Sequence, residues 1–485
     1  MQRRFITKSV LLGAFFALMI ALPVGQAFAQ GSTTSALSGT VVDEKGEGLP
    51  GATVIAIHEP TGSRYGASTR GDGRYNIVNM RVGGPYKVTV SFVGYKESVQ
   101  SGISLTLASE LRQNFKLELN QSQLEEVKVV ASRSSVINSG RTGAATTVSN
   151  SSITTLPTLN RSLGDFARLD PRANGLNFAG RNALYNNVTV DGAFFNNAFA
   201  LSPTIGGQAG ASPISVDAID QFQVLIAPYD VRQGMATGAN INVVTKSGTN
   251  DWSGSAYYFG TDQNQVGNKI GDVVSQYGNF QRGQFGGRIG GALVKNKLFV
   301  FASFEQEAQS DPGSNFVATR TGTEPNKSIA KAEDLDRLKS FLVSKFNYDP
   351  GAYENYNKEK YSQKANVRLD WNISDKHKFN LKYNYLRSYA DISPSNSGSM
   401  SGGRAPSAAV LPFQGSLYRI NNNLDSYIAE LNSTFSSTVA NNLTVGYTQM
   451  RDFRQSPVNN TPFPTVDIGN NNSNELTTFG FEPFS

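Results

Sequence analysis

The stretch ANVRLDWNISDKHKFNLKYNYL, from Ala365 to Leu386, alternates apolar and polar side chains on either side of a short turn. A repeat of two residues is typical of a β-strand with one apolar and one polar face. The stretch therefore predicts two neighbouring strands joined by a turn at 374–377. Their apolar face could contact either the core of a soluble sandwich or lipid, and the rest of the chain decides between the two.

The composition of the 485 residues excludes several classes of protein. A hydrophobic fraction of 39% and a mean hydropathy of −0.31 exclude a bundle of membrane helices. They permit a transmembrane β-barrel, in which only alternate residues meet lipid. The chain has no cysteine, which excludes disulfides and thiol chemistry. Its two histidines, His58 and His377, are far apart and are expected at the surface, so we expect no metal site and no other cofactor.

The segment 1–29 has the features of a cleaved secretory signal peptide. Two arginines and a lysine precede an apolar stretch at 10–22, which is shorter than the ~20 residues of a membrane helix. The cleavage site is predicted at Ala27, Ala29 and Gln30. Without this segment the formal charge falls from +6 to +3, from 41 basic and 38 acidic residues, and no basic run is interleaved with aromatic residues. Nucleic acid is therefore not an expected partner.

Residues 35–120 contain short alternating segments separated by glycine-containing turns, a pattern typical of a small β-sandwich. They resemble the carboxypeptidase regulatory-like domain, which is a transthyretin-like sandwich. The residues that carry the resemblance are Gly39, Val41, Asp43, Gly46, Leu49, Pro50, Gly51, Ala52, Val54, Asp72, Gly73, Tyr75, Ile77, Tyr86, Gly94 and Tyr95. The resemblance implies a non-catalytic accessory domain. The same fold group includes carbohydrate-binding modules, so a carbohydrate-binding role of the sandwich stays an alternative.

The linker 121–133 contains a short β-prone run that begins with two acids, LEEVKVV. This run could be the first strand of the next domain. It could also be an extended peptide that adds as a strand to the sheet edge of a partner. In that case it is similar to the TonB box of TonB-dependent receptors, and the candidate residues are Leu124, Glu125, Glu126, Val127, Lys128, Val129 and Val130.

Residues 134–250 are rich in loops and carry a series of short motifs. Strands are expected at 188–190, 222–226 and 241–245, with a turn after the first of them. The series resembles the plug domain of TonB-dependent receptors, and the forms APYDVRQG and TKSGTN resemble its Oar-like branch. The motif residues are Asp191, Gly192, Pro228, Tyr229, Gly234, Gly238, Asn242, Thr245 and Lys246. The resemblance implies an α/β plug domain.

Residues 251–485 repeat the hairpin pattern, and long polar connections at 307–363 and 392–425 separate the hairpins. A soluble sandwich rarely has such connections, whereas an outer-membrane barrel has short turns on one side and long loops on the other. The polar faces carry Arg368, Asp370, Lys378 and Lys382, which suit a lumen filled by water or by a plug, and the apolar faces carry the aromatic residues Trp371, Tyr383 and Tyr385. We therefore predict that the apolar face meets lipid.

The expected fold class is mostly β: a transthyretin-like sandwich, an α/β plug and a partial antiparallel transmembrane barrel. About eight strands are expected after the plug, while plugged transporters close with about 22 and an eight-stranded interior is filled by its own side chains. The sequence therefore predicts an incomplete barrel, as in the N-terminal part of a longer receptor.

The sequence has no phosphate-binding loop, no His-Glu-x-x-His and no Gly-x-Ser-x-Gly, so no enzyme is expected. The resemblance implies active import of a siderophore, glycan or peptide across the outer membrane of a Gram-negative bacterium. It implies a TonB-type energising protein in the periplasm, outer-membrane lipid and an extracellular ligand as partners, with a surface lipoprotein as a possible further one. A surface structural, adhesive or export-related role, as in Oar-like proteins, is the alternative.

Overall fold

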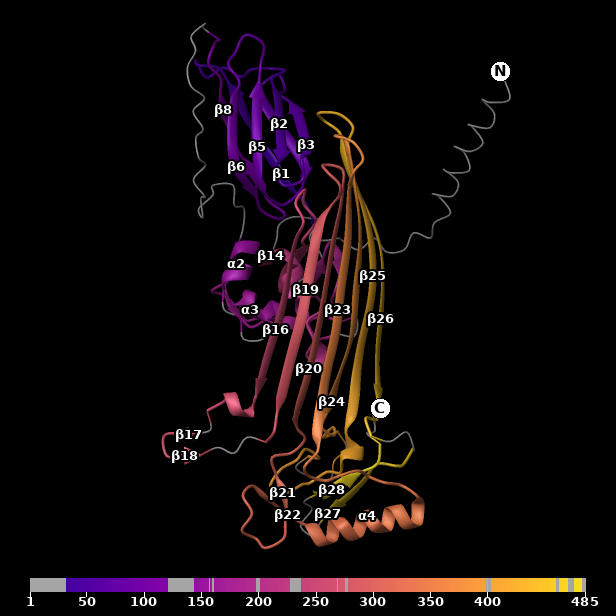
Figure 1. Ribbon diagram of the computed structural model, residues 1–485. Helices are drawn as coiled ribbons and strands as arrows, with labels where there is room; N and C mark the ends of the chain where they lie inside the picture. Colours follow the sequence, from indigo (N-terminus) through magenta and orange to yellow (C-terminus); the bar gives the residue numbers. More distant parts are fainter. Residues whose placement is uncertain are drawn as a thin grey trace, which may run out of the picture.

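The computed structural model describes residues 32–120, 144–156, 158, 161–197, 201–226, 237–267, 269–274, 278–397, 399, 403–458, 462–469 and 475–481. These residues form a sandwich, a plug and a tall sheet that we call the wall, and the far end of the wall carries a small folded cap (Figure 1). Within this part of the chain, each helix is too short or too polar to span a bilayer.

The sandwich consists of one mixed and one antiparallel sheet, with a core of their own. Its strands are β1 (Ser35–Val42), β2 (Thr53–His58), β3 (Ser63–Ser68), β4 (Arg74–Met80), β5 (Gly83–Ser91), β6 (Ser98–Leu105), β7 (Glu110–Arg112) and β8 (Phe115–Lys116). One sheet has the order β4-β1-β7, with β8 also paired to β1, and the other has the order β3-β2-β5-β6. Alternate apolar residues such as Val54, Val88 and Val90 fill the space between the sheets. This confirms the predicted β-sandwich.

The plug is built on a mixed sheet of five strands in the order β13-β12-β15-β14-β9. Its elements are β9 (Ala144–Ser149), α2 (Asn150–Thr155), α3 (Leu163–Ala167), β10 (Ala173–Asn174), β11 (Asn177–Phe178), η1 (Ala183–Tyr185), β12 (Asn187–Val190), β13 (Ala193–Phe194), η2 (Gly207–Ala209), η3 (Val216–Ala218), β14 (Ile219–Ile226) and β15 (Ala239–Thr245). Strands β12 and β15 are parallel, and every residue of both is buried. The combination of buried strands and short helices is the α/β plug that the sequence predicts.

The wall contains seven long strands, each antiparallel to the next. They are β16 (Ser253–Asp262), β19 (Gln281–Val294), β20 (Leu298–Pro312), β23 (Asn357–Asn372), β24 (His377–Ile392), β25 (Tyr418–Thr434) and β26 (Ala440–Gln455), in that order across the sheet. Short turns at 295–297, 373–376 and 435–439 lie at the sandwich end, and the longer connections lie at the cap end. Strands β16 and β26 are the edges of this sheet among the described residues, so the sheet is open.

Residues 365–386 form adjoining parts of β23 and β24, in a register that pairs Leu369 with Leu381. The charged residues Arg368 and Lys382 point toward the plug and are buried, with 7% and 1% of their surface exposed. The apolar residues that alternate with them, such as Leu369 and Leu381, point to the opposite side, where Leu381 is 43% exposed. The apolar face therefore does not contact a protein core, which is the arrangement that a lipid-facing wall requires.

The cap corrects the expectation that the connections 307–363 and 392–425 are polar loops. Strands β20 and β23 extend into the first connection, and β25 extends into the second. The cap itself contains β21 (Val317–Thr319), β22 (Lys327–Lys331), α4 (Ala332–Phe346), η5 (Gln414–Ser416), β27 (Val466–Gly469) and β28 (Glu475–Phe479). Helix α4 forms because apolar residues recur at helical spacing and pack on a small core of buried residues, among them Leu335, Leu342, Tyr348, Leu411 and Phe413. Between β16 and β19 lie η4 (Gln263–Gln265) and the pair β17 (Lys269–Ile270) and β18 (Val273–Val274).

The plug and the wall share one apolar core, whereas the sandwich does not join it. The buried cluster of the plug includes Phe301, Leu386 and Leu424, which belong to wall strands β20, β24 and β25. The buried cluster of the sandwich contains only residues of the sandwich. Contacts between the sandwich and the other two bodies are therefore mainly polar, and they lie at the short-turn end of the wall.

Candidate functional site at the junction of plug, wall and sandwich

The turn after β12 places the carboxylate of Asp191 in the interior of the plug. Asp191 and Gly192 have φ angles of 53° and 86°, a left-handed conformation that aspartate tolerates and glycine adopts freely. The Asp191 carboxylate accepts hydrogen bonds from the backbone nitrogen of Thr245 at 3.1 Å and from its Oγ1 at 2.7 Å. Two motifs that the sequence gives separately, the turn at 191–192 and the strand that ends at Thr245, are thus in direct contact.

Two cations of the wall contact this pair of motifs. Arg368 donates from Nη1 to the carbonyl oxygen of Thr245 at 2.8 Å and lies 3.8 Å from Asp191 Oδ1. Lys382 Nζ lies 3.6 Å from the same oxygen and 3.2 Å from Oε2 of Glu430 on β25. These side chains are almost fully buried. Because a buried charge is costly unless it is paired, the wall and the plug each satisfy charges that the other carries.

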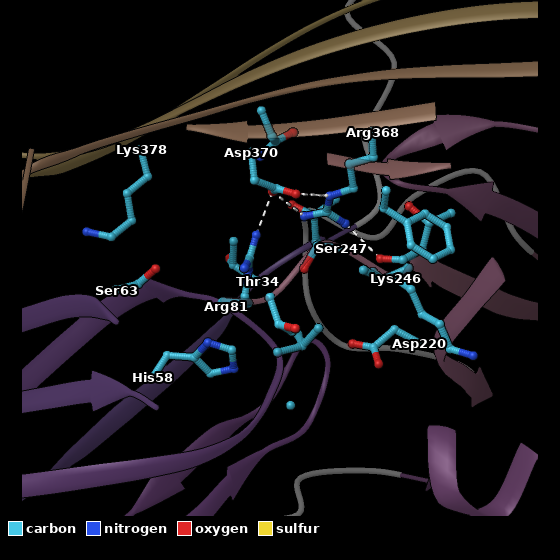
Figure 2. Close-up of a pocket in the computed structure, with 18 of the residues that line it drawn as sticks. Thr34, His58, Ser63, Arg81, Asp220, Lys246, Ser247, Arg368, Asp370 and Lys378 are labelled. Carbon is cyan, nitrogen blue, oxygen red and sulfur yellow. Dashed lines mark hydrogen bonds and ion pairs between the residues drawn. The ribbon is translucent and has the colours of Figure 1, made fainter. Parts of the chain in front are cut away.

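The sandwich contributes the next contact of this network through Arg81, which follows β4. Arg81 Nη2 lies 2.6 Å from Oδ1 of Asp370 on β23. The same carboxylate accepts from Nε and Nη2 of Arg368, at 2.9 to 3.1 Å. Figure 2 shows Asp370 between the two guanidinium groups. One carboxylate of the wall is therefore shared by an arginine that contacts the plug and an arginine of the sandwich.

Further hydrogen bonds connect the sandwich to the rim of the wall. Thr33 Oγ1 donates to Glu430 Oε1 at 2.7 Å, and Asn372 Nδ2 donates to Ser63 Oγ at 2.9 Å. Lys378 donates to the carbonyl oxygen of Arg64 at 2.9 Å. These contacts involve β23, β24 and β25, so the sandwich contacts several neighbouring strands of the wall.

The sandwich also contacts the plug directly, through two glutamines of β14. Gln221 accepts from the backbone nitrogen of Leu107 at 2.8 Å and donates to the carbonyl oxygen of Leu105 at 3.2 Å. Gln223 donates to the carbonyl oxygen of Leu107 at 2.6 Å. A small apolar cluster of Val82, Leu107 and Val244 lies beside these bonds. The same face of the sandwich thus contacts both plug and wall.

A polar cavity of about 300 Å³ lies where the three bodies meet (Figure 2). We call the residues around it the junction; those labelled in the figure are Thr34, His58, Ser63, Arg81, Asp220, Lys246, Ser247, Arg368, Asp370 and Lys378. Burial raises the pKa of the Asp220 carboxyl. Burial, and then the charge of Arg288, lower the pKa of Lys246 to about 8. The junction is therefore a site of strongly perturbed charges.

His58 corrects the expectation of a surface histidine. It is 5% exposed, and its Nδ1 lies 2.7 Å from Thr61 Oγ1. Burial, followed by the charge of Arg81, lowers its pKa to about 3. The alternation of β2 could have predicted this burial, because Val54, Ala56 and His58 are on the same buried face.

The other predicted plug residues have structural contacts near this site. Lys246 donates from Nζ to the carbonyl oxygen of Asp217 at 2.9 Å, and Asn242 accepts from Thr189 at 2.7 Å. A Cβ on Gly238 would lie 2.5 Å from Oδ1 of Asn186, so a larger residue there would require Asn186 to move. Pro228, Tyr229 and Gly234, the candidate TonB box at 124–130 and the cleavage site at Ala27, Ala29 and Gln30 lie outside the described residues.

Sequence reasoning named Asp191 and Asp370 but missed other charged residues that take part in these contacts. The wall residue Glu305 accepts from Ser215 of the plug at 2.7 Å and pairs with Lys364 at 2.6 Å, which gives a second polar contact between plug and wall. Glu430 and Arg81 were likewise not singled out. The alternating pattern of the wall strands shows that charged residues lie on their polar faces. It does not show which residues of the plug or the sandwich they contact.

Comparison with known proteins finds matches to the sandwich and to the wall. Residues 36–118 match the carboxypeptidase regulatory-like domain, and residues 244–485 match an outer membrane beta barrel domain. The chain is 28% identical over 297 residues to the TonB-dependent transporter Oar of Myxococcus xanthus, which covers 57% of this chain and 27% of that protein. The chain thus spans about a quarter of the length of that relative.

Two solved structures of outer-membrane proteins are similar to part of this chain. The outer membrane transporter YddB from Escherichia coli has a TM-score of 0.43 at 15% identity, covering 64% of this chain and 40% of its own. The siderophore receptor PirA from Acinetobacter baumannii has a TM-score of 0.40 at 13% identity, with the same coverage of both chains.

Proposed function

This chain is an outer-membrane β-barrel protein of the Gram-negative type and a homologue of the TonB-dependent transporter Oar, and from that premise we propose that it works as a TonB-dependent importer. A ligand binds at the cap end, and a periplasmic TonB-type protein moves the plug so that the ligand passes. The proposal covers siderophore, glycan and peptide ligands.

The observation that carries this proposal is the paired burial of charge between plug and wall. Asp191 of the plug lies against Arg368 and Lys382 of the wall, and all three are buried. Moving the plug separates these charges and costs free energy, because each buried charge loses its partner. The outer membrane holds no nucleotide to supply that energy, so the proposal requires a partner that delivers it by contact.

The proposed point of contact is the linker between sandwich and plug. The described part of the sandwich ends at residue 120 and that of the plug begins at 144, and both belong to bodies that meet at the short-turn end of the wall. In outer-membrane barrels the short turns face the periplasm. The candidate box Leu124–Val130 would pair there as an added strand with the energising protein.

The test measures binding of a purified periplasmic domain of a TonB-type protein to the protein in detergent. Deleting 124–130 should abolish binding, while deleting 134–140, the seven residues that directly follow the linker 121–133, should leave it unchanged. Surface amounts of both variants should match the unmodified protein. Equal binding by both deletion variants would remove the proposal.

The same variants discriminate the Oar-like structural, adhesive or export-related alternative. In that case the 124–130 deletion should leave the surface phenotype intact. The carbohydrate-binding alternative predicts that residues 32–120 bind glycans on an array. The aromatic rings of the described sandwich are buried or half-buried, so they do not favour that alternative.

A further inference from the structure

We propose that the sandwich is a detachable cover of the periplasmic end of the barrel, and that the contact of Arg81 with Asp370 holds it in place. The purpose of this detachment rests on the proposed function, since the plug moves only during transport. The test of detachment is independent of that function, because it needs neither ligand nor energising protein.

The sandwich has the construction of a separable body. Its 17 buried core residues all belong to itself, so detaching it leaves its core intact. The plug, in contrast, shares its core with three wall residues. The apolar part of the interface is small, with Val82 and Leu107 against Val244. Interfaces of this polar kind between domains commonly allow relative movement.

The position of the sandwich explains why it has to detach. It contacts β14 of the plug through Gln221 and Gln223, and the wall through Asp370, Asn372 and Lys378 at the same end. A plug that is drawn toward the periplasm meets the docked sandwich first. The sandwich therefore acts as a second barrier, which must leave before the plug can move.

The contact of Arg81 couples this detachment to the plug. Asp370 has two arginine partners, and the second, Arg368, donates to Thr245 of the plug. When Arg81 leaves, Asp370 keeps Arg368 as its partner, so no wall charge is left unpaired. Arg81 itself is 15% exposed in its side chain and gains water on leaving. The pair can therefore open more readily than the fully buried pairs behind it.

The test uses single cysteines, which the absence of native cysteine allows. Leu107→Cys reports on the interface, since Leu107 is 0% exposed against the plug. Val88→Cys is the control, since Val88 is 0% exposed in the core of the sandwich. Labelling with a water-soluble maleimide is followed on the protein in detergent. We expect Cys labelling at position 107 to be faster than at 88.

Arg81→Ala should accelerate labelling at position 107 by about tenfold or more and leave that at 88 unchanged. Arg74→Ala is the matched variant, because Arg74 pairs with Asp72 on the exposed surface of the sandwich; it should change neither rate. The proposal is overturned if Arg81→Ala leaves labelling at 107 unchanged. It is also overturned if 107 and 88 accelerate together, which would mean that the sandwich unfolds.

A cross-link tests the same inference in the opposite direction. The side chains of Ser63 and Asn372 lie 2.9 Å apart across the interface, so Ser63→Cys with Asn372→Cys should form a disulfide under oxidant. Oxidation should slow amide hydrogen exchange at 105–108, and a reductant should restore it. Equal exchange in both states would contradict detachment. Failure of the TonB-binding experiment, with these results intact, would remove the proposed function alone.

Discussion

Arg368 of the wall donates to the carbonyl oxygen of Thr245, the last residue of plug strand β15, at 2.8 Å. The bond ties the end of a plug strand to a charged residue of the barrel. Since Arg368 also pairs with Asp370 and lies near Asp191, one guanidinium organises the contact between plug and wall.

We expect Arg368→Ala to loosen the plug. The variant leaves Asp191 and Asp370 with one cation fewer, and breaking a buried pair on one side typically costs ~3–5 kcal/mol. Hydrogen exchange should become faster over 219–226 and 239–245, and stay slow in the strands of the wall. The matched control is Arg387→Ala, since Arg387 pairs with Asp425 on the outer face and is 36% exposed in its side chain. Equal effects of both variants would contradict a special role of Arg368.

We expect Gly238→Ala to destabilise the plug for steric reasons. The new Cβ would lie 2.5 Å from Asn186 Oδ1 and 3.2 Å from the carbonyl oxygen of Tyr185. Asn186 also accepts from the backbone nitrogen of Ala239 at 2.9 Å, so moving it breaks a buried bond. We expect the plug to lose ~1–3 kcal/mol of stability. The measurement is amide hydrogen exchange of β15 as a function of urea, and its midpoint should move to a lower urea concentration. Gly267→Ala should leave this midpoint unchanged, because open space surrounds Gly267. If Gly267→Ala lowered the midpoint as much as Gly238→Ala, the steric explanation would be contradicted.

The stability of the sandwich should decrease on acidification because of His58. Its pKa is about 3 in the folded protein against 6.5 in the unfolded chain, owing first to burial and then to the charge of Arg81. Between these values the unfolded chain binds more protons, so stability falls as the pH is lowered, by at most ~1.4 kcal/mol per pH unit from this group. Hydrogen exchange of β2 and β5 in the unmodified protein and in His58→Asn, from pH 6.5 to 4, measures the difference. Identical pH slopes would contradict the prediction.

The sequence was sufficient to predict which face of β23 and β24 is turned to the lumen. A period of two residues fixes the two faces of a strand without knowledge of its neighbours, so Arg368 and Lys382 could be assigned to the lumen from alternation alone. The turn at Asp191 and Gly192 could be predicted for a similar reason, because its conformation is local.

The contacts between charged residues of different bodies could not be predicted from the sequence. Arg81 and Asp370 lie in different bodies, and their contact depends on how the sandwich docks. Helix α4 was missed because its buried residues, Leu335 and Leu342, lie in a segment with many charged residues. A helix in such a segment is stabilised by packing on other parts of the cap, and that packing is not visible in the local sequence.

Placing a charge on the outer face of the wall tests whether this face meets lipid. Leu381 is the fifth of the 16 residues of β24, pairs with Leu369 and Ala429, and points away from the plug. If this face meets lipid, Leu381→Arg places a charge in the hydrocarbon region, where it costs ~2–4 kcal/mol near the midplane. We expect less protein in the outer membrane and lower resistance of the folded form to heating in detergent. Gln363→Arg is the matched variant: Gln363 lies on the same face, beside Arg387 and closer to the cap, where a charge should be tolerated. If both variants assembled as well as the unmodified protein, the outer face would not be in contact with lipid.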